Sequence, residues 1–172
     1  MRALVTGAAG FVGSNLAVTL AGQGARIVGL DDFSAGHFKN LQDFRGDFVS
    51  ADLCRPGDWE GGVGKVDVIF HQAAVTDTTV TDQLKMMRVN VEAFRSLLDF
   101  AARHKVKKVV YASSAGVYGD GAVPMRESAD PKPLNVYAFS KSVMVQTAGE
   151  FPAVETVGLR YFNVFGPRES HK

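Results

Sequence analysis

Three residues in the second half of the chain could together carry out acid–base chemistry. Tyr137 and Lys141 are four residues apart in NVYAFSK, a stretch with helical character, so both side chains project from one face. A tyrosine is a poor base at its ordinary pKa of about 10, but a nearby ammonium favours the phenolate. Ser114 ends the apolar run KKVVYASS and adds a hydroxyl, unless it merely caps the following turn. Together these residues predict proton transfer to or from a substrate hydroxyl.

A glycine-rich turn near the N-terminus predicts where a phosphate would bind. In TGAAGFVG, Gly7, Gly10 and Gly13 lie between a β-branched run and a stretch of helical periodicity. Missing side chains let the backbone approach a pyrophosphate, and the helix N-terminus offers amide donors. Three glycines could also serve only tight packing. Asp31, eighteen residues after Gly13 (31 − 13 = 18), lies near where an acidic residue holds an adenosine ribose, and this favours dinucleotide binding.

The elements that must position these residues alternate between strand and helix. Six apolar runs predict strands, at 3–7, 26–31, 47–52, 66–73, 107–114 and 154–162, and a helix is expected over 11–24. A stripe before the fifth run predicts an amphipathic helix facing the core, with members Leu84, Met87, Val91, Phe94, Leu98 and Ala101. Asp52, ending the third run, could bond an adenine amino group or be an exposed strand end. The alternation predicts an α/β fold, a Rossmann-type doubly wound parallel sheet with helices on both faces.

Composition narrows the class of protein. The 172 residues are 46% hydrophobic and 22% charged, which predicts one soluble globular domain over 1–172. A formal charge of +1 gives no reason to expect a nucleic-acid partner. No basic segment precedes a long apolar run, and the single cysteine, Cys54, fits a reducing compartment. We expect a cytoplasmic protein with no membrane partner and no metal site.

The motifs, in order, resemble those of the extended short-chain dehydrogenase/reductases, the NAD-dependent epimerases and dehydratases. The matching segments are TGAAGFVGSN, FHQAA, YASSAGVYG, YAFSK and LRYFNVFGP. Within that family, LDDFSAGHFKNL, ESADPKPLNVYAFSK and RYFNVFGPRESHK are most similar to the epimerases that invert C6 of ADP-glycero-manno-heptose for lipopolysaccharide cores. The resemblance implies a nucleotide-sugar substrate, ADP-heptose first, and a homo-oligomer at full length. It also implies tightly bound NADP or NAD, which takes a hydride from the sugar carbon and returns it to the opposite face.

The resemblance implies roles for individual residues. Tyr137 would be one acid/base, and Lys141 would bind the cofactor ribose and tune Tyr137. Lys172 would be the second acid/base, and two bases suit a reaction that serves two faces of one carbon. Ser114 would act with Tyr137 at the substrate, and Asn163 would also contact it. The expected cofactor contacts are Gly7, Gly10, Phe11, Val12, Gly13, Asp31, Asp32, Asp52, Ala73, Ala74, Val75, Thr76, Asn90, Lys141 and Val164.

Two positions depart from the family pattern. Gly116 stands where many sugar-nucleotide epimerases and dehydratases carry a threonine, and Asp32 stands where asparagine is common in heptose epimerases. A second carboxylate would repel a 2′-phosphate, but His37 and Lys39 could compensate, so NADP and NAD both stay open. The alternative enzyme is a UDP- or dTDP-sugar 4-epimerase or dehydratase, although the stretch after Ser114 lacks the acidic pair of a dehydratase.

The family's chains continue past Lys172 into a smaller substrate-binding portion that is absent here. The resemblance therefore implies a fragment, whose own activity is open. A non-catalytic nucleotide-binding module is the alternative from another class. A fragment would expose apolar residues near Phe162, Phe165 and Pro167, whereas a module would present a polar, capped surface there.

Overall fold

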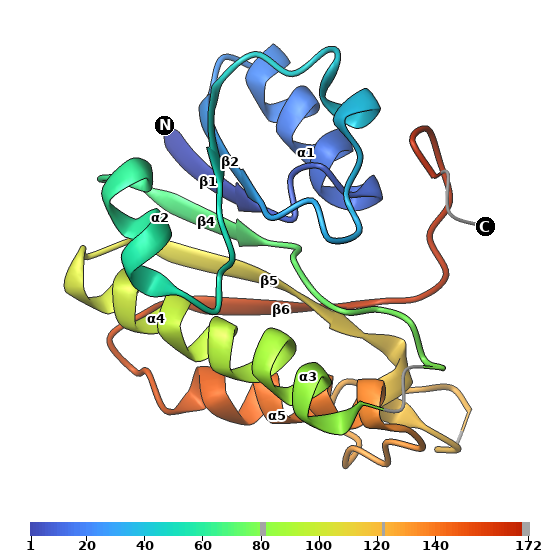
Figure 1. Cartoon of the computed structure of the whole chain (residues 1–172). Coiled ribbons are helices and arrows are strands. Elements are labelled where there is room, and N and C mark those ends of the chain that lie inside the picture. The colour runs from blue at the N-terminus through green and yellow to red at the C-terminus, as the bar shows by residue number, and fades with distance from the viewer. Residues whose placement is uncertain (80–81, 122, 170–172) are drawn as a thin grey trace.

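The computed structural model describes residues 1–79, 82–121 and 123–169, and its centre is a sheet of parallel strands (Figure 1). Along the chain, the described strands are β1 (Arg2–Thr6), β2 (Arg26–Asp31), β3 (Asp47–Ser50), β4 (Val68–His71), β5 (Lys108–Ser114) and β6 (Thr156–Tyr161). They lie in the order β3-β2-β1-β4-β5-β6, and every neighbouring pair is parallel. The six predicted strands are confirmed, although several end at other residues.

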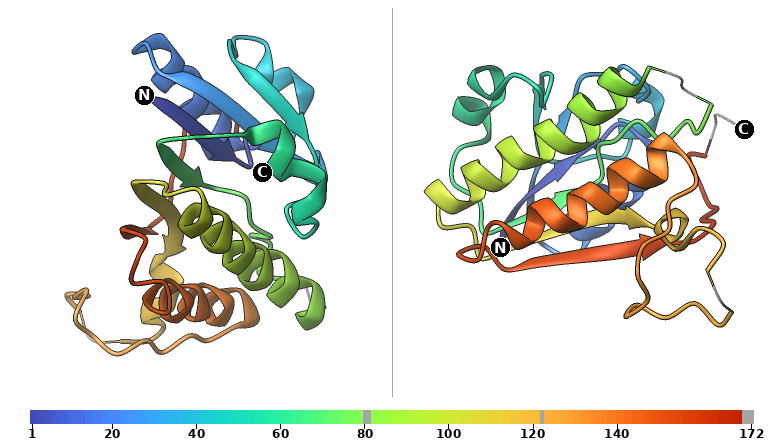
Figure 2. Two further views of the ribbon diagram at one scale, coloured as in Figure 1. Left: turned by 90° about the vertical axis from the view of Figure 1, so that its left-hand side faces the viewer. Right: turned by 90° about the horizontal axis from the view of Figure 1, so that it is seen from below.

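Helices cover both faces of this sheet. The described helices are α1 (Phe11–Gly22), η1 (Phe38–Leu41), α2 (Pro56–Val63), α3 (Gln83–Met87), η2 (Arg88–Glu92), α4 (Ala93–Arg103), η3 (Ala115–Tyr118) and α5 (Val136–Gly149). α1 packs against β1 and β2 on one face, while α4 and α5 lie side by side on the other (Figure 2). The predicted doubly wound fold with helices on both faces is confirmed.

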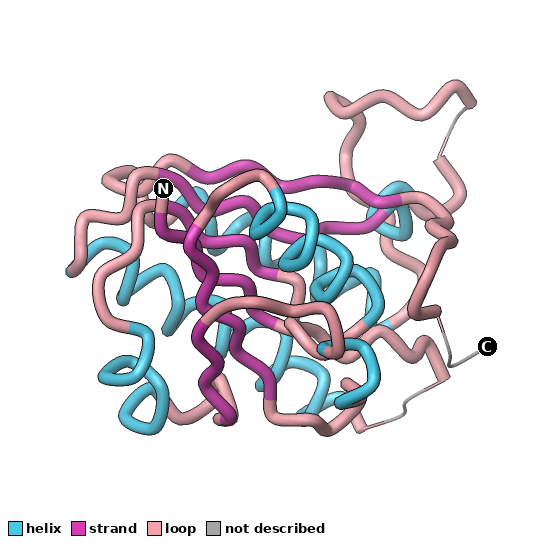
Figure 3. The backbone as a smooth tube through the Cα atoms, turned by 90° about the horizontal axis from the view of Figure 1, so that it is seen from above, coloured by secondary structure: helices cyan, strands magenta, loops and turns pink. Residues whose placement is uncertain are grey.

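The strand order reverses direction at β1. Thr6, the last residue of β1, is paired with Leu30 of β2 and with His71 of β4. The chain leaves β1 for β2 and β3 on one side and later crosses to β4, β5 and β6 on the other. Figure 3 shows the strands side by side with helices around them. Ligands of such sheets bind outside the carboxyl ends of the strands at this reversal.

Two apolar clusters hold the helices to the sheet. The larger one lies between the sheet and α2, α4 and α5, and the smaller one lies under α1. In the larger cluster the fully buried Trp59 meets Phe100 edge to face, with ring centroids 5.1 Å apart. Trp59 is also the only tryptophan of the chain, so its fluorescence reports on this cluster.

The predicted apolar stripe before β5 is correct except at its beginning. Val91, Phe94, Leu98 and Ala101 are buried, but Leu84 is 85% exposed, and Met86 is fully buried in its place. The cause is η2, a π-helical turn between α3 and α4. A π turn contains an additional residue, so α3 is rotated about the helix axis relative to α4, and a constant helical period assigns its residues to the wrong face.

Two predicted strands end two residues earlier than the apolar runs suggest. β3 ends at Ser50 rather than at 52, because the Asp52 carboxylate accepts a hydrogen bond from Cys54 N at 2.8 Å and closes a turn. β4 covers 68–71 rather than 66–73, which leaves Ala73 in the following loop. Asp52 is therefore in a turn beyond its strand. None of the helices in the described ranges is long and apolar enough to span a bilayer.

Because the π turn of η2 rotates α3 relative to α4, truncating Leu98 and truncating Leu84 should change the free energy of unfolding by different amounts. Leu98→Ala empties a buried site and should lower the free energy of unfolding by about 2–5 kcal/mol. Leu84→Ala, at an exposed site, should change it by no more than about 0.5 kcal/mol. Urea unfolding followed by Trp59 fluorescence measures both. Equal losses in the two variants would contradict the rotated helix.

Candidate functional site

The glycine turn joins β1 to α1 with almost no space for side chains. A Cβ atom on Gly13 would lie 2.0 Å from Gly7 O, and one on Gly7 would lie 2.8 Å from Ala73 N. Gly7 has φ +66°, a conformation that strains other residues. The three predicted glycines thus bring α1, the end of β1 and the loop after β4 into direct contact. Packing and ligand approach both depend on them.

The first turn of α1 leaves its amide groups available to an anion. Gly10 is the N-cap and provides no side-chain hydrogen bond, whereas Asn135 caps α5 by accepting from Ala138 N at 2.8 Å. The first amides of a helix have no partner within the helix, and here they belong to Phe11 and its successors. An uncapped helix N-terminus beside a glycine turn fits the pyrophosphate of a dinucleotide.

Asp31 is fixed by backbone amides at the end of β2. Its carboxylate, 7% exposed, accepts hydrogen bonds from Ala9 N at 2.9 Å and Phe33 N at 2.8 Å. Burial raises the pKa of Asp31, and the Ala9 and Phe33 amides lower it. Asp32 is exposed and accepts from Ser34 N at 2.9 Å. Asp31 therefore ties the glycine turn to β2, and its contact with a ribose stays a prediction.

The buried side-chain amide of Asn90 holds the loop after β4 in place. Asn90, in η2, accepts from Val75 N at 2.8 Å and donates to Val75 O at 3.0 Å. Its Nδ2 also lies 2.9 Å from Ser140 Oγ, and Ser140 donates to Tyr137 O at 2.7 Å. The stretch of Ala73, Ala74, Val75 and Thr76 predicted to line the cofactor is thereby linked to α5. Asn90 thus fixes the backbone of Val75, and its contact with the cofactor stays a prediction.

Ser114, Tyr137 and Lys141 meet where β5 ends against the start of α5. Ser114 is the last residue of β5, and its hydroxyl accepts from Gly116 N at 3.1 Å. Burial raises the pKa of the half-buried Tyr137, while the Ser114 hydroxyl lowers it. The predicted acid–base residues are thus brought together by two elements. The Ser114 hydroxyl acts on Tyr137 as well as capping η3.

Lys141 is buried and bonded to the backbone rather than to the tyrosine hydroxyl. Its ammonium donates to Ala112 O at 2.8 Å and lies 5.7 Å from the centroid of the Tyr137 ring. Burial lowers the pKa of Lys141 to about 7. Lowering of the Tyr137 pKa by this ammonium stays a prediction, since burial acts on Tyr137 in the opposite direction.

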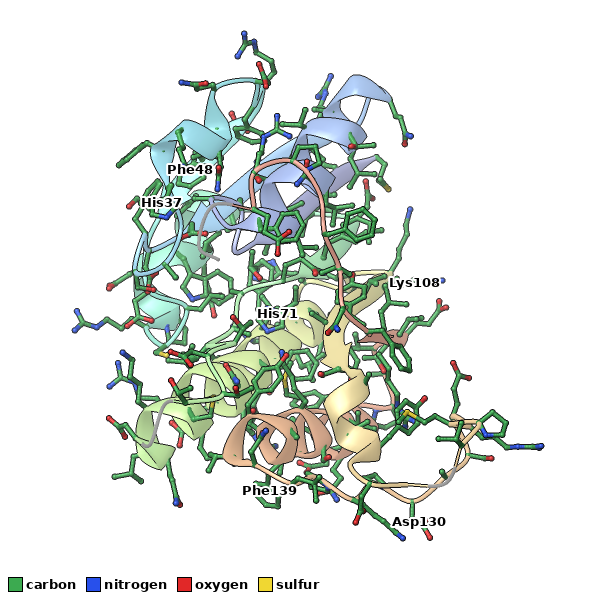
Figure 4. The ribbon with its side chains drawn as sticks, turned by 90° about the vertical axis from the view of Figure 1, so that its right-hand side faces the viewer. His37, Phe48, His71, Lys108, Asp130 and Phe139 are labelled. Atoms are coloured by element: carbon green, nitrogen blue, oxygen red, sulfur yellow. The ribbon has the colours of Figure 1, made fainter. Side chains whose placement is uncertain are left out.

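Three supporting residues were not identified from the sequence. Ser140 links Asn90 to α5, and Thr6 Oγ1 accepts from Ala73 N at 3.2 Å and bonds His71 Nδ1 at 2.8 Å. His71 lies in the interior between the strands and α4 (Figure 4), stacked on a phenylalanine ring 5.2 Å away. Burial, with a smaller contribution from Lys141, lowers its pKa to about 3. The available signal was that His71 lies inside FHQAA, Ser140 inside YAFSK and Thr6 at the start of TGAAGFVGSN.

The remaining predicted residues lie in turns and segments beyond the strands or outside the described residues. Asp52 bonds Cys54 N and faces Arg88 at 3.5 Å. Asn163 and Val164 are exposed on the segment after β6, and Lys172 is outside the described residues. Among the residues that the structure describes, no group of three or more His, Cys, Asp or Glu side chains could hold a metal ion.

The fold and the glycine turn define an α/β protein of the Rossmann type, and comparison gives its family. Residues 3–172 match the model of the NAD dependent epimerase/dehydratase family. The chain belongs to that family.

Solved structures of family members superpose closely on the chain. ADP-L-glycero-D-manno-heptose-6-epimerase from Helicobacter pylori is 45% identical with a TM-score of 0.90, covering 98% of this chain and 56% of that one. UDP-glucose 4-epimerase from Brucella ovis in complex with NAD is 32% identical, with a TM-score of 0.85 and coverage of 94% and 52%. UDP-N-acetylglucosamine 4-epimerase from Methanobrevibacter ruminantium is 30% identical, with a TM-score of 0.88 and coverage of 98% and 57%. The chain thus spans little more than half the length of these enzymes.

The buried Lys141 should give the protein a characteristic stability profile. Unfolded lysine keeps its proton up to a pH near 10.4, whereas folded Lys141 releases it near 7, so the unfolded state binds more protons between these values. The contribution of Lys141 to the free energy of unfolding should therefore rise with pH in this window, by up to about 1.4 kcal/mol per unit. Urea unfolding of nucleotide-free wild type and Lys141→Met at pH 7, 8, 9 and 10 measures it.

The control is Lys85→Met, at an exposed position of α3. Wild type minus Lys141→Met should increase with pH, while wild type minus Lys85→Met should stay flat. Parallel profiles for wild type and Lys141→Met would show that the folded ammonium keeps an ordinary pKa.

Proposed function

We propose that the protein is a NAD(P)-dependent nucleotide-sugar epimerase that inverts C6 of ADP-glycero-manno-heptose. One observation supports the enzyme class. Ser114, Tyr137 and Lys141 lie together at the carboxyl edge of the sheet, and the glycine turn lies at the same edge. The heptose substrate is supported by the 45% identity to the Helicobacter pylori heptose epimerase over 98% of this chain, against 30–32% for the two 4-epimerases.

Each part of the edge has a distinct task in this proposal. The amides at the start of α1 would bind the pyrophosphate, and Asp31 and Asp32 would bind the adenosine ribose. Lys141 would bind the second ribose. When bound, the nicotinamide would accept a hydride from the sugar carbon and return it to the opposite face. Tyr137, bonded to Ser114, would move the proton of the sugar hydroxyl, and Lys172 would serve the other face as second acid/base.

The site at Gly116 supports the heptose assignment over the 4-epimerase and dehydratase alternatives. A Cβ atom there would lie 3.3 Å from Ser114 Oγ and 3.4 Å from Ala138 Cβ. A side chain there would be tight, and Ser114 Oγ and Ala138 would have to give by a few tenths of an ångström. Glycine at this position supports a substrate that is held without the threonine contact found in many other family members.

The surface beyond β6 supports an epimerase portion rather than a self-contained nucleotide-binding module. Phe162 is 63% exposed, Phe165 is 91% exposed, and Pro167 is exposed. A module would present polar side chains there. We propose that the substrate-binding portion of the family packs on these side chains. The expected homo-oligomer stays a prediction. Leu84 and Phe139 are exposed apolar side chains, and sedimentation of variants at these positions can test whether they contribute to an interface.

Removing the hydroxyl of Tyr137 tests the acid–base assignment. In the whole gene product, Tyr137→Phe should lower the rate of C6 inversion of ADP-heptose by about 10²–10⁴-fold, because general acid–base catalysis contributes a factor of this size. The proton NMR signals of the two heptose epimers follow the reaction. Dinucleotide content, measured by mass spectrometry after denaturation, should stay at the wild-type level.

Tyr111→Phe is the matched control, because Tyr111 lies in the same strand as Ser114 but is buried in the core. It should keep most of the activity. Full activity in Tyr137→Phe would contradict the proposed acid–base role of Tyr137. Lys172→Met, assayed beside it, tests the second base in the same reaction.

The second carboxylate at the adenosine end should influence the choice of cofactor. Asp32 is exposed and would lie near a 2′-phosphate, so Asp32→Asn should favour NADP⁺ over NAD⁺ by about 1 kcal/mol, roughly fivefold in relative affinity. Competitive titration of the two oxidised cofactors by calorimetry measures the ratio. Asp99→Asn, on the exposed face of α4, removes the same charge elsewhere and should leave the ratio unchanged. If the ratio of NADP⁺ to NAD⁺ affinity is unchanged in Asp32→Asn, this carboxylate does not lie at the ribose site.

A further inference from the structure

The chain crosses the ligand-facing edge of the sheet after β6. β6 is the outer strand, and β5 and β4 separate it from β1. Residues 162–169, here called the strap, nevertheless reach α1, where Pro167 O accepts a hydrogen bond from Asn15 Nδ2 at 2.7 Å. Figure 4 faces this edge and shows the C-terminal segment passing across the strand ends toward α1. The strap therefore spans the edge that carries both the glycine turn and Ser114.

Arg168 anchors the far end of the strap with two charge-assisted hydrogen bonds. Its Nη1 donates to Asn15 Oδ1 at 2.8 Å, and its Nη2 donates to Asp43 Oδ2 at 2.8 Å. The Arg168 side chain is only 21% exposed, although the strap is a surface segment. Its backbone has φ +68°, an uncommon conformation for a residue with a side chain. These bonds hold Arg168 in that conformation.

Asn15 uses its whole side-chain amide in this contact. Besides Arg168 and Pro167, it bonds Phe11 O at 2.9 Å, at the first turn of α1. Gly166 lies against the Phe11 ring, which is 3.6 Å from the place of a Cβ on that glycine. One side chain therefore connects the strap to the helix end that would bind the pyrophosphate.

Asp43 belongs to a segment that is itself fastened to the glycine turn. His37 N donates to Ala9 O at 2.9 Å, and Asn40 Nδ2 donates to the same oxygen at 2.9 Å. Arg168 thus joins three stretches that surround the turn: the strap, α1 and the segment after η1. The strap is more than one hundred residues from the other two stretches in sequence, so this junction is a product of the tertiary fold.

We propose that Asn15, Asp43 and Arg168 form a latch that holds the strap across the bound dinucleotide and limits the rate at which it leaves. This inference rests on the proposed function, since it takes the strap residues Asn163 and Val164 to lie against the substrate and the nicotinamide. The latch acts by holding the strap in place, because its side chains contact one another and the backbone of α1 and the strap. A dinucleotide held under the strap leaves only after the bonds of Arg168 break.

Release of reduced cofactor from the whole gene product measures the latch. Arg168→Met should raise the dissociation rate of NADH or NADPH by roughly tenfold to a hundredfold, because hydrogen bonds of a charged group are lost. The association rate should change by less than threefold. Stopped-flow fluorescence of the cofactor, chased with excess oxidised form, gives both rates. Arg45→Met is the control: it removes the same charge two residues from Asp43, where Arg45 bonds only backbone oxygens.

Two further measurements separate a latch from a general loss of stability. Asp43→Asn should raise the dissociation rate severalfold, and in the double variant with Arg168→Met the two effects should be less than additive, as for partners in one contact. In cofactor-free protein, Arg168→Met should speed hydrogen exchange of strap amides while leaving β1 and β4 protected. Exchange that rises throughout the sheet would show that Arg168 supports the fold instead.

The outcomes are distinct. Dissociation rates within twofold of wild type in Arg168→Met, with dinucleotide still bound, would overturn the latch while leaving the proposed function intact. Failure of the proposed function would look different, because wild-type protein itself would bind no dinucleotide.

Discussion

The contact between Gly13 and Gly7 O is the constraint on which the site depends. A side chain at position 13 would lie 2.0 Å from that oxygen, so α1 can approach the end of β1 only because glycine is present. This approach places the uncapped N-terminus of α1 at the reversal of strand order. Asp31 then fixes the turn to β2 through Ala9 N. Tight packing and the proposed anion binding, which looked like alternative roles for these glycines, would therefore use the same geometry.

A second set of contacts links the glycine turn to the predicted acid–base residues. The loop after β4 touches Gly7, is bonded by Asn90, and reaches α5 through Ser140, whose hydroxyl donates to Tyr137 O. A displacement of α5 would therefore also disturb the loop predicted to line the cofactor. Buried polar groups with satisfied hydrogen bonds favour a single arrangement of the elements that they join. The proposed dinucleotide site and the proposed proton-transfer site are therefore joined by one set of hydrogen bonds.

The sequence predicted the parts of the fold that follow from local patterns. Six apolar runs became six strands, and the glycines and the Tyr137–Lys141 pair were placed correctly at turn and helix. The burial of Leu84 was predicted wrongly because a π turn breaks the helical period, which composition does not reveal. The burial of Lys141 and the bond from Arg168 to Asn15 depend on segments far apart in sequence, so no local pattern indicates them. The family resemblance supplied roles that spacing alone leaves open.

The central claim is that a dinucleotide binds at the glycine turn with its pyrophosphate on the first amides of α1. Titration of ¹⁵N-labelled protein with NAD⁺ and NADP⁺, followed by amide NMR, tests it most directly. The account predicts that the largest shift changes fall on the amides of residues 7–13, with smaller ones at 73–76 and in the strap, and that β3 and the C-terminal half of α4 stay unchanged. Saturable changes located elsewhere, with residues 7–13 unaffected, would contradict it.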